Sequence, residues 1–215
     1  MRTNIPLLRQ PAHSSLCGEA CLKMIYAHHG IEKSIYKIRD ELQDIRKTFK
    51  NGSNFFEIGL HIVISGFDCT MKLWPSSNNT LACKKWHMPQ KKLFEELRSF
   101  FKISKINRQL ECRLLLKFIE NGGKFIPEIT SLNEIKRSTA DGIIALLNYS
   151  YLNSEATPCF EPVGHFVVPL EINRKNVVIN DPHYKNNLAL SHKEFLFMFY
   201  TGDAAILFIK KRFAT

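Results

Sequence analysis

The spacing of apolar residues changes at Gly122-Gly123, and this change constrains the fold more than any other feature of the chain. Before it, apolar side chains recur every three or four residues, as they do in amphipathic helices. Helices are expected at about 17–30, 34–46, 54–65, 90–103 and 109–120, with one short strand at about 66–74. After it, short apolar runs alternate with turn residues, which is typical of antiparallel strands.

These later runs lie at 125–129, 142–148, 164–172, 176–179 and 204–209, with a short helix expected at about 191–200. The sequence therefore predicts an α+β protein of one domain, residues 1–215. Its helical N-terminal lobe is expected to cover about residues 1–123, and its antiparallel-sheet C-terminal lobe about residues 124–215.

Cys17 stands where the first expected helix begins, after a loop that contains Pro11. Free N–H groups and the positive end of the helix dipole favour the thiolate, which is the nucleophilic form of cysteine. Gln10, in the preceding loop, is placed to offer its side-chain amide to an oxyanion, with the Cys17 backbone N–H as a second donor. A cysteine at such a position is also a common packing residue, so this segment alone leaves both interpretations open.

Two motifs near the C-terminus contain the partners that a nucleophilic cysteine needs. His165 lies in the apolar run 164–168, and Asp181 ends the next run, directly before a proline. A cysteine nucleophile needs a base, and the base needs an orienting group. His165 and Asp181 are sixteen residues apart, which suits adjacent antiparallel strands that are joined at Arg174-Lys175. Taken singly, the histidine also fits a core position, and Asp-Pro fits an ordinary turn.

Together these motifs resemble those of a known family. The pattern Gln-x6-Cys-Gly-x-Ala-x-Leu-x-Met, followed by Gly-His-Phe-Val-Val and then Asp-Pro, is similar to the papain-like cysteine peptidases that trim double-glycine leaders from bacteriocin precursors. The resemblance implies a papain-like fold with the active site in a cleft between the two lobes. It also implies Gln10 as oxyanion donor, Cys17 as nucleophile, His165 as base and Asp181 as its orienting partner.

Those peptidases usually form the front end of an export transporter. This sequence has no membrane segment or nucleotide-binding module, so a stand-alone relative is expected. The expected function is that of a cysteine peptidase or amide hydrolase, which forms a thioester with a peptide or protein substrate. An acyltransferase or transpeptidase would use the same residues, and a non-catalytic protein-binding module would keep the fold without the chemistry.

Three other histidines are alternatives to consider beside His165. His13 and His183 are rival bases, but neither lies in a motif that matches the family. His61, on the third expected helix, is expected to be exposed rather than functional.

The net charge of +10 is concentrated in residues 84–108. An apolar stripe within this region favours an amphipathic helix with a solvated basic face, and no known nucleic-acid-binding motif accompanies it. Nucleic acid is therefore not an expected partner. We interpret residues 76–123 as a basic helical insertion whose positive face suits an acidic substrate protein.

Neither a cofactor nor a metal is expected. Cys83 and His87 have a spacing that begins some zinc sites, but no second pair follows, and the six cysteines are expected to be free thiols. No apolar run reaches the roughly 18 residues that a membrane span needs, and no secretory signal peptide is recognisable. Two locations fit: the cytoplasm, or export without a cleaved signal, including delivery into a host cell as a bacterial effector.

Overall fold

The computed structural model describes residues 3–47, 52–73, 106–149 and 164–212, together with residues 92 and 95. Its helices are α1 (Cys17–His28), α2 (Ile35–Arg46), α3 (Phe55–Ile64), α6 (Ile106–Glu120), α7 (Leu132–Ser138) and α8 (His192–Thr201). Its strands are β1 (Phe67–Lys72), β2 (Lys124–Ile126), β3 (Ile143–Asn148), β4 (Gly164–Ile172), β5 (Asn176–Asn180), β6 (Leu188–Ser191) and β7 (Ile206–Lys211). The protein is α+β, as the sequence predicts.

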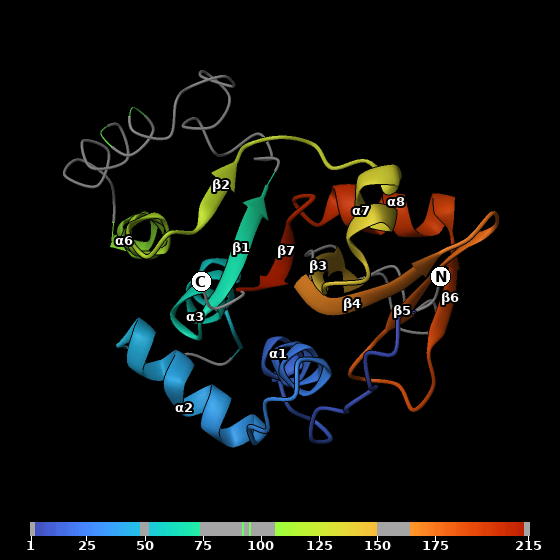
Figure 1. Ribbon diagram of the computed structural model, residues 1–215, viewed down its shortest axis with the longest axis horizontal. Coiled ribbons are helices and arrows are strands. Elements are labelled where there is room, and N and C mark those ends of the chain that lie inside the picture. Colours follow the sequence, from blue (N-terminus) through green and yellow to red (C-terminus); the bar gives the residue numbers. More distant parts are fainter. Residues whose placement is uncertain are drawn as a thin grey trace.

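The strands form one sheet in the order β2-β1-β7-β3-β4-β5-β6 (Figure 1). The strand β1, from before residue 123, pairs with β7 near the C-terminus and so belongs to the same sheet as the later strands. The pairs β1–β7, β7–β3, β3–β4, β4–β5 and β5–β6 are antiparallel, whereas β1 and β2 are parallel. The expectation of a purely antiparallel sheet was therefore wrong at this edge.

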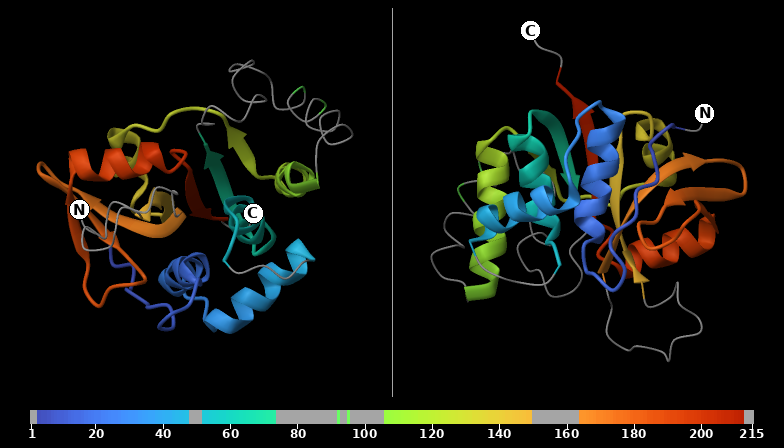
Figure 2. Two further views of the ribbon diagram at one scale, coloured as in Figure 1. Left: turned by 180° about the vertical axis from the view of Figure 1, so that it is seen from behind. Right: turned by 90° about the horizontal axis from the view of Figure 1, so that it is seen from below.

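Helices cover both faces of the sheet, with α1 and α3 on one side and α7 and α8 on the other (Figures 1 and 2). Alternate residues of the central strands divide between two cores, because successive side chains of a strand point to opposite faces. On β4, Phe166 and Val168 pack in the core with α1, α3 and α6, whereas Val167 packs in the core with α7 and α8.

Side-chain caps explain where several helices begin. Ser34 accepts a hydrogen bond from the Lys37 N–H at the start of α2. Asn54 and Ser191 begin α3 and α8 with capping boxes. In each, the cap side chain accepts a hydrogen bond from a helix backbone N–H, and the glutamate three residues later accepts one from the backbone N–H of the cap residue. These caps satisfy N–H groups that the helix itself leaves unpaired.

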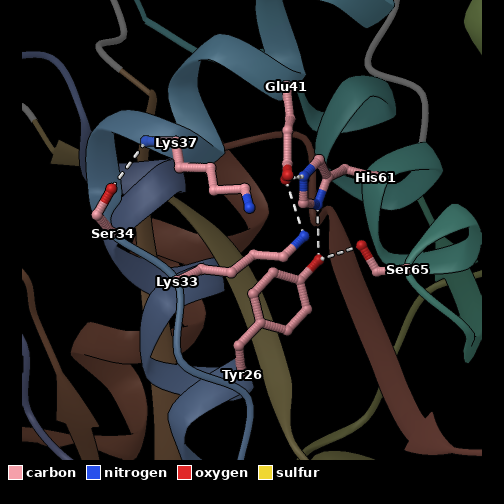
Figure 3. A network of polar contacts seen from close by, with 7 residues as sticks. All are labelled: Tyr26, Lys33, Ser34, Lys37, Glu41, His61 and Ser65. Carbon is pink, nitrogen blue, oxygen red and sulfur yellow. Dashed lines mark hydrogen bonds and ion pairs between the residues drawn. The ribbon is translucent and has the colours of Figure 1, made fainter.

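His61 is buried, so the expectation that it would be exposed was wrong. Its Nε2 lies 2.8 Å from Glu41 Oε2 and its Nδ1 lies 2.6 Å from the Tyr26 hydroxyl, and Lys33 completes the cluster with an ion pair to Glu41 (Figure 3). Tyr26 comes from α1, Glu41 from α2 and His61 from α3. The cluster therefore joins the three helices of the N-terminal part, including the one that begins at Cys17.

The N-terminal arm runs beside β4 and β5. The Thr3 hydroxyl donates to the Leu170 carbonyl at 2.9 Å, and the Asn180 side-chain amide donates to the Ile5 carbonyl at 3.0 Å. The Gln10 N–H donates to the Pro182 carbonyl at 3.0 Å. The N-terminal arm is thus bound to the part of the sheet that contains His165 and is followed by Asp181.

The helix α7 and the strand β6 were not predicted, and α6 begins three residues earlier than expected. The expected basic helix at 90–103, the charged segment 84–108 and the Cys83–His87 pair lie largely or wholly outside the described residues. None of the described helices is long and apolar enough to span a bilayer.

Candidate active site

Cys17 is the first residue of α1, and its side chain is half-buried. The residue before it, Leu16, gives no side-chain cap, so the backbone N–H groups of the first turn are left for another acceptor. Gly18 lets this end of the helix pack closely, because a Cβ at that position would lie 2.6 Å from Ile58 Cδ1 and 3.3 Å from Phe166 Cδ2. The glycine after Cys17 thus brings the helix start against α3 and β4.

His165 and Asp181 form a buried pair on the β4–β5 hairpin. His165 Nε2 lies 2.8 Å from Asp181 Oδ1, and Asp181 is fully buried. The two strands are antiparallel, as expected, and Asp181 directly follows the last residue of β5. The same Oδ1 accepts the His183 backbone N–H at 2.8 Å, which fixes the carboxylate. These two bonds hold the Asp181 carboxylate against the imidazole.

Cys17 lies close enough to His165 to affect the pKa of the imidazole. Burial of the imidazole lowers its pKa, but the hydrogen bond to Asp181, the neighbouring Cys17 and the negative charges of both groups raise it to about 9. Because Nε2 bonds to Asp181, Nδ1 is the ring nitrogen left to exchange a proton with the thiol. The pKa favours an imidazolium at neutral pH, paired with the Asp181 carboxylate.

Gln10 lies in the loop before Cys17, but its side chain bonds to that loop. Its Nε2 donates to the Ser14 carbonyl at 2.7 Å, and its buried Oε1 has no hydrogen-bond partner among the described residues. A primary amide has two N–H groups, so this bond leaves one of them for a further acceptor. The side chain of Gln10 thus bonds within the loop that precedes Cys17, while its backbone N–H bonds to Pro182.

Tyr149 is a neighbour of the base that the sequence analysis did not identify. Its ring centroid lies 4.5 Å from that of His165, and it lies 5.9 Å from His183. Burial raises the pKa of Tyr149, so the phenol stays neutral. Its position follows from the pairing of β3 with β4, in which Leu147 lies opposite His165. An aromatic residue at the end of the strand before the histidine strand is a weak sequence signal.

The rival groups are placed differently. The His13 side chain is exposed in the loop, and His183 is exposed and joins Asp181 only through its backbone. Cys21, one turn after Cys17, is fully buried, and burial first and the charge of Cys17 second raise its pKa. Burial likewise raises the pKa of Cys69. Of the four cysteines that the structure describes, all free, Cys17 is the one that affects the pKa of His165.

No family model and no curated protein matches the sequence. Several solved structures match along nearly the whole chain, and two of them are described here. One is a double-glycine motif protease from an AMS/PCAT transporter, in complex with the leader peptide, with 18% identity, a TM-score of 0.51 and coverage of 98% of this chain and 94% of the other. The second is the peptidase domain of Streptococcus ComA, a bi-functional ABC transporter, with 14% identity, a TM-score of 0.50 and coverage of 97% and 100%.

The chain has the papain-like fold of these peptidase domains. The expected fold is therefore confirmed. In this papain-like fold, a helix that begins at Cys17 meets a strand that begins next to His165, although 148 residues separate the two in sequence.

Proposed function

We propose that the protein is a cysteine peptidase or amide hydrolase that acts on a peptide or protein through a thioester intermediate. One observation carries this proposal: His165 bonds to Asp181 and lies close enough to Cys17 for the two groups to interact, and Cys17 begins a helix. Nucleophile, base and orienting group in this order are what acyl transfer through cysteine requires.

In the proposed reaction, His165 Nδ1 accepts the thiol proton, and the thiolate attacks the amide carbonyl carbon. The Asp181 carboxylate stabilises the imidazolium, and the helix N-terminus stabilises the thiolate. The tetrahedral oxyanion is bound by the Cys17 N–H and by the free N–H of the Gln10 amide. When the intermediate collapses, the imidazolium gives its proton to the leaving amine. Water, deprotonated by His165, then hydrolyses the thioester and restores the thiol.

A peptide is the proposed class of substrate. One structural neighbour was solved with a leader peptide bound, which supports a peptide substrate for this fold. The proposal does not extend to cleavage after a double glycine, because at 18% identity the likeness concerns the fold alone.

The test is the rate of iodoacetamide alkylation at each cysteine against pH, followed by peptide mass spectrometry, in the wild type and in His165→Ala. We expect Cys17 to react rapidly below pH ~7, because an ion-paired thiolate exists well below the midpoint of about 8.5 for an ordinary thiol. The substitution should move its profile upward. Cys21 and Cys69 serve as internal controls and should stay inert, since both are buried.

If Cys17 instead follows the profile of an ordinary thiol in the wild type, the catalytic proposal fails, and the fold serves as a binding module. If Cys17 is activated, a second assay separates hydrolysis from acyl transfer. A thioester formed from an activated peptide ester is offered water or an added amine. Hydrolysis predicts release of the free acid even when the amine is present at millimolar concentration.

A further inference from the structure

The loop before Cys17 and the loop that begins at Asp181 are hydrogen-bonded to each other beside the candidate active site. The Arg9 guanidinium donates to the His183 carbonyl at 3.5 Å, and the next residue, Gln10, bonds through its backbone to the same loop. The first loop leads to the nucleophile, and the second begins with the carboxylate that bonds to the base. Side chains from both loops therefore border the site.

Three exposed basic side chains come from these loops: Arg9 from the first, and His183 and Lys185 from the second. We call the surface that they form the basic rim. Within the described part of the chain, neither Arg9 nor Lys185 forms an ion pair with a carboxylate. A guanidinium has several N–H groups, so the bond to the His183 carbonyl leaves others for a further acceptor.

The chain segments that form the basic rim contain no exposed acidic residue. Residues 3–18 and 182–193 have neither aspartate nor glutamate. Asp181, directly before the second segment, is fully buried and paired with His165. A positive surface without counter-charges from its own segments attracts anionic groups.

The basic rim is on the same side of the site as the base. The ring centroid of His183 lies 5.9 Å from that of Tyr149, which in turn lies 4.5 Å from that of His165. In the proposed reaction the imidazolium gives its proton to the leaving amine, so the segment of the substrate that leaves must pass the base. The basic rim is next to this path.

We propose that the basic rim binds acidic side chains of the leaving segment, so that the preferred substrate is a peptide with aspartate or glutamate shortly after the cleaved bond. The inference rests on the proposed peptidase function and specifies its substrate. Arginine binds a carboxylate through two parallel N–H···O bonds, and lysine contributes a point charge. The carboxylates must be some residues away from the cleaved bond, because the Cys17 thiolate repels them at short range.

The test uses two chloroacetyl peptides that differ only in charge. In both, the chloroacetyl group is followed by glycine and then by two glutamates in one probe or two glutamines in the other. The Cys17 sulfur bonds to the chloromethyl carbon and chloride leaves, while the peptide continues from the amide nitrogen as a leaving segment does. We expect the glutamate probe to react about threefold to tenfold faster at low salt, as two exposed ion pairs predict. The advantage should shrink in about 1 M sodium chloride, where the Debye length is about 3 Å.

Arg9→Gln combined with Lys185→Gln should remove most of this advantage, whereas Arg9→Lys, which keeps the charge, should retain most of it. The matched control is Arg174→Gln combined with Lys175→Gln, which removes the same two charges. These two exposed residues lie at the turn between β4 and β5, at the opposite end of the hairpin from His165. The control should keep the advantage of the glutamate probe.

The possible failures are distinguishable. An iodoacetamide profile typical of an ordinary thiol would overturn the peptidase proposal, and this inference with it. If iodoacetamide marks Cys17 as activated but the two probes react equally fast, only the assignment of the basic rim is wrong. Equal losses in the rim variant and in the control would assign the preference to the net charge of the whole protein and would also overturn it.

Discussion

At the scale of single residues, the pKa of His165 is the most informative quantity. Although burial lowers its pKa, Asp181 and Cys17 raise it to about 9. We expect Asp181→Asn to move the pKa of His165 down, toward the ordinary value, because the imidazolium loses a buried counter-charge. The pH at which the ring loses its proton, followed by NMR, measures this change. A midpoint that stays near 9 in the variant would mean that Asp181 does not stabilise the imidazolium.

Tyr149 is expected to help to hold the same proton. Its ring centroid lies 4.5 Å from that of the imidazole, with the two rings tilted by 46°, and at this distance an aromatic ring attracts a cation by about 0.5–1 kcal/mol. Tyr149→Leu should therefore lower the pKa of His165 by about 0.4–0.7. Tyr149→Phe keeps the ring and should keep the titration midpoint. If the phenylalanine variant behaves like the leucine variant, the hydroxyl and not the ring is responsible.

At the scale of elements, the close contact between the start of α1 and the helix α3 depends on the absence of a side chain at Gly18. A Cβ on Gly18 would lie 2.6 Å from Ile58 Cδ1, and Ile58 is fully buried. We expect Gly18→Ala to destabilise the fold by about 1–3 kcal/mol, in spite of the better helix propensity of alanine. The measurement is urea unfolding, with Cys17 alkylation as a second readout.

Ile58→Val removes the atom that conflicts and provides the control. Alone it should cost about 0.5–1.5 kcal/mol, but combined with Gly18→Ala it should cost less than the two separate effects summed. Additive losses would show that the strain of Gly18→Ala arises elsewhere.

The cluster that joins α1, α2 and α3 makes stability depend on pH. Burial, as the main cause, lowers the pKa of His61. The imidazole therefore binds a proton less readily in the folded protein than in the unfolded chain. Stability is therefore complete above the ordinary pKa of about 6.5 and falls below it, by at most about 1.4 kcal/mol per pH unit. The raised pKa of His165 contributes the opposite dependence, so the loss is measured as the difference between the wild type and His61→Gln in urea unfolding at pH 7.5 and 5.5.

His61→Gln should flatten that loss while it lowers stability at both pH values, because the Tyr26 hydroxyl and Glu41 lose their partner. His13→Asn is a suitable control, since His13 is exposed and has a positive φ that asparagine tolerates. An unchanged pH dependence in His61→Gln would assign the effect to another group.

These elements also show what local sequence determines. The helices α1, α2 and α3 were predictable because their apolar residues recur every three or four positions, and two of them have capping residues. The seven residues of α7 are too few to reveal a period. The burial of His61 was not predictable, since it depends on Tyr26 and Glu41, which lie 35 and 20 residues away in sequence.

At the scale of the whole molecule, the site was easier to anticipate than the sheet that supports it. Cys17, His165 and Asp181 were singled out because each lies in a short motif with a chemical meaning. The pairing of β1 with β7 joins Phe67 to Lys211, and no local pattern specifies a contact over that separation. The position of Tyr149 beside His165 depends on the register of β3 against β4, which no local pattern specifies.

The N-terminal arm is the long-range contact with the clearest consequence for the site. Asn180 is fully buried, its amide donates to the Ile5 carbonyl, and its side-chain oxygen accepts from Asn187. We expect Asn180→Ala to cost about 1–3 kcal/mol, because a buried carbonyl loses its donor. Amide hydrogen exchange should then speed up along residues 5–10, including the Gln10 N–H that bonds to Pro182.

If Gln10 binds the oxyanion, Asn180→Ala should slow the alkylation of Cys17 by a peptidyl chloromethyl ketone, whose carbonyl can form an oxyanion. It should slow alkylation by iodoacetamide less, because that reaction develops no oxyanion. Thr3→Val is the control, because it removes only the hydrogen bond to Leu170 at the far end of the arm. It should leave both rates and the exchange of Gln10 unchanged. Equal slowing of both reagents in Asn180→Ala would indicate that the arm positions Cys17 or His165 and that Gln10 has no part in binding the oxyanion.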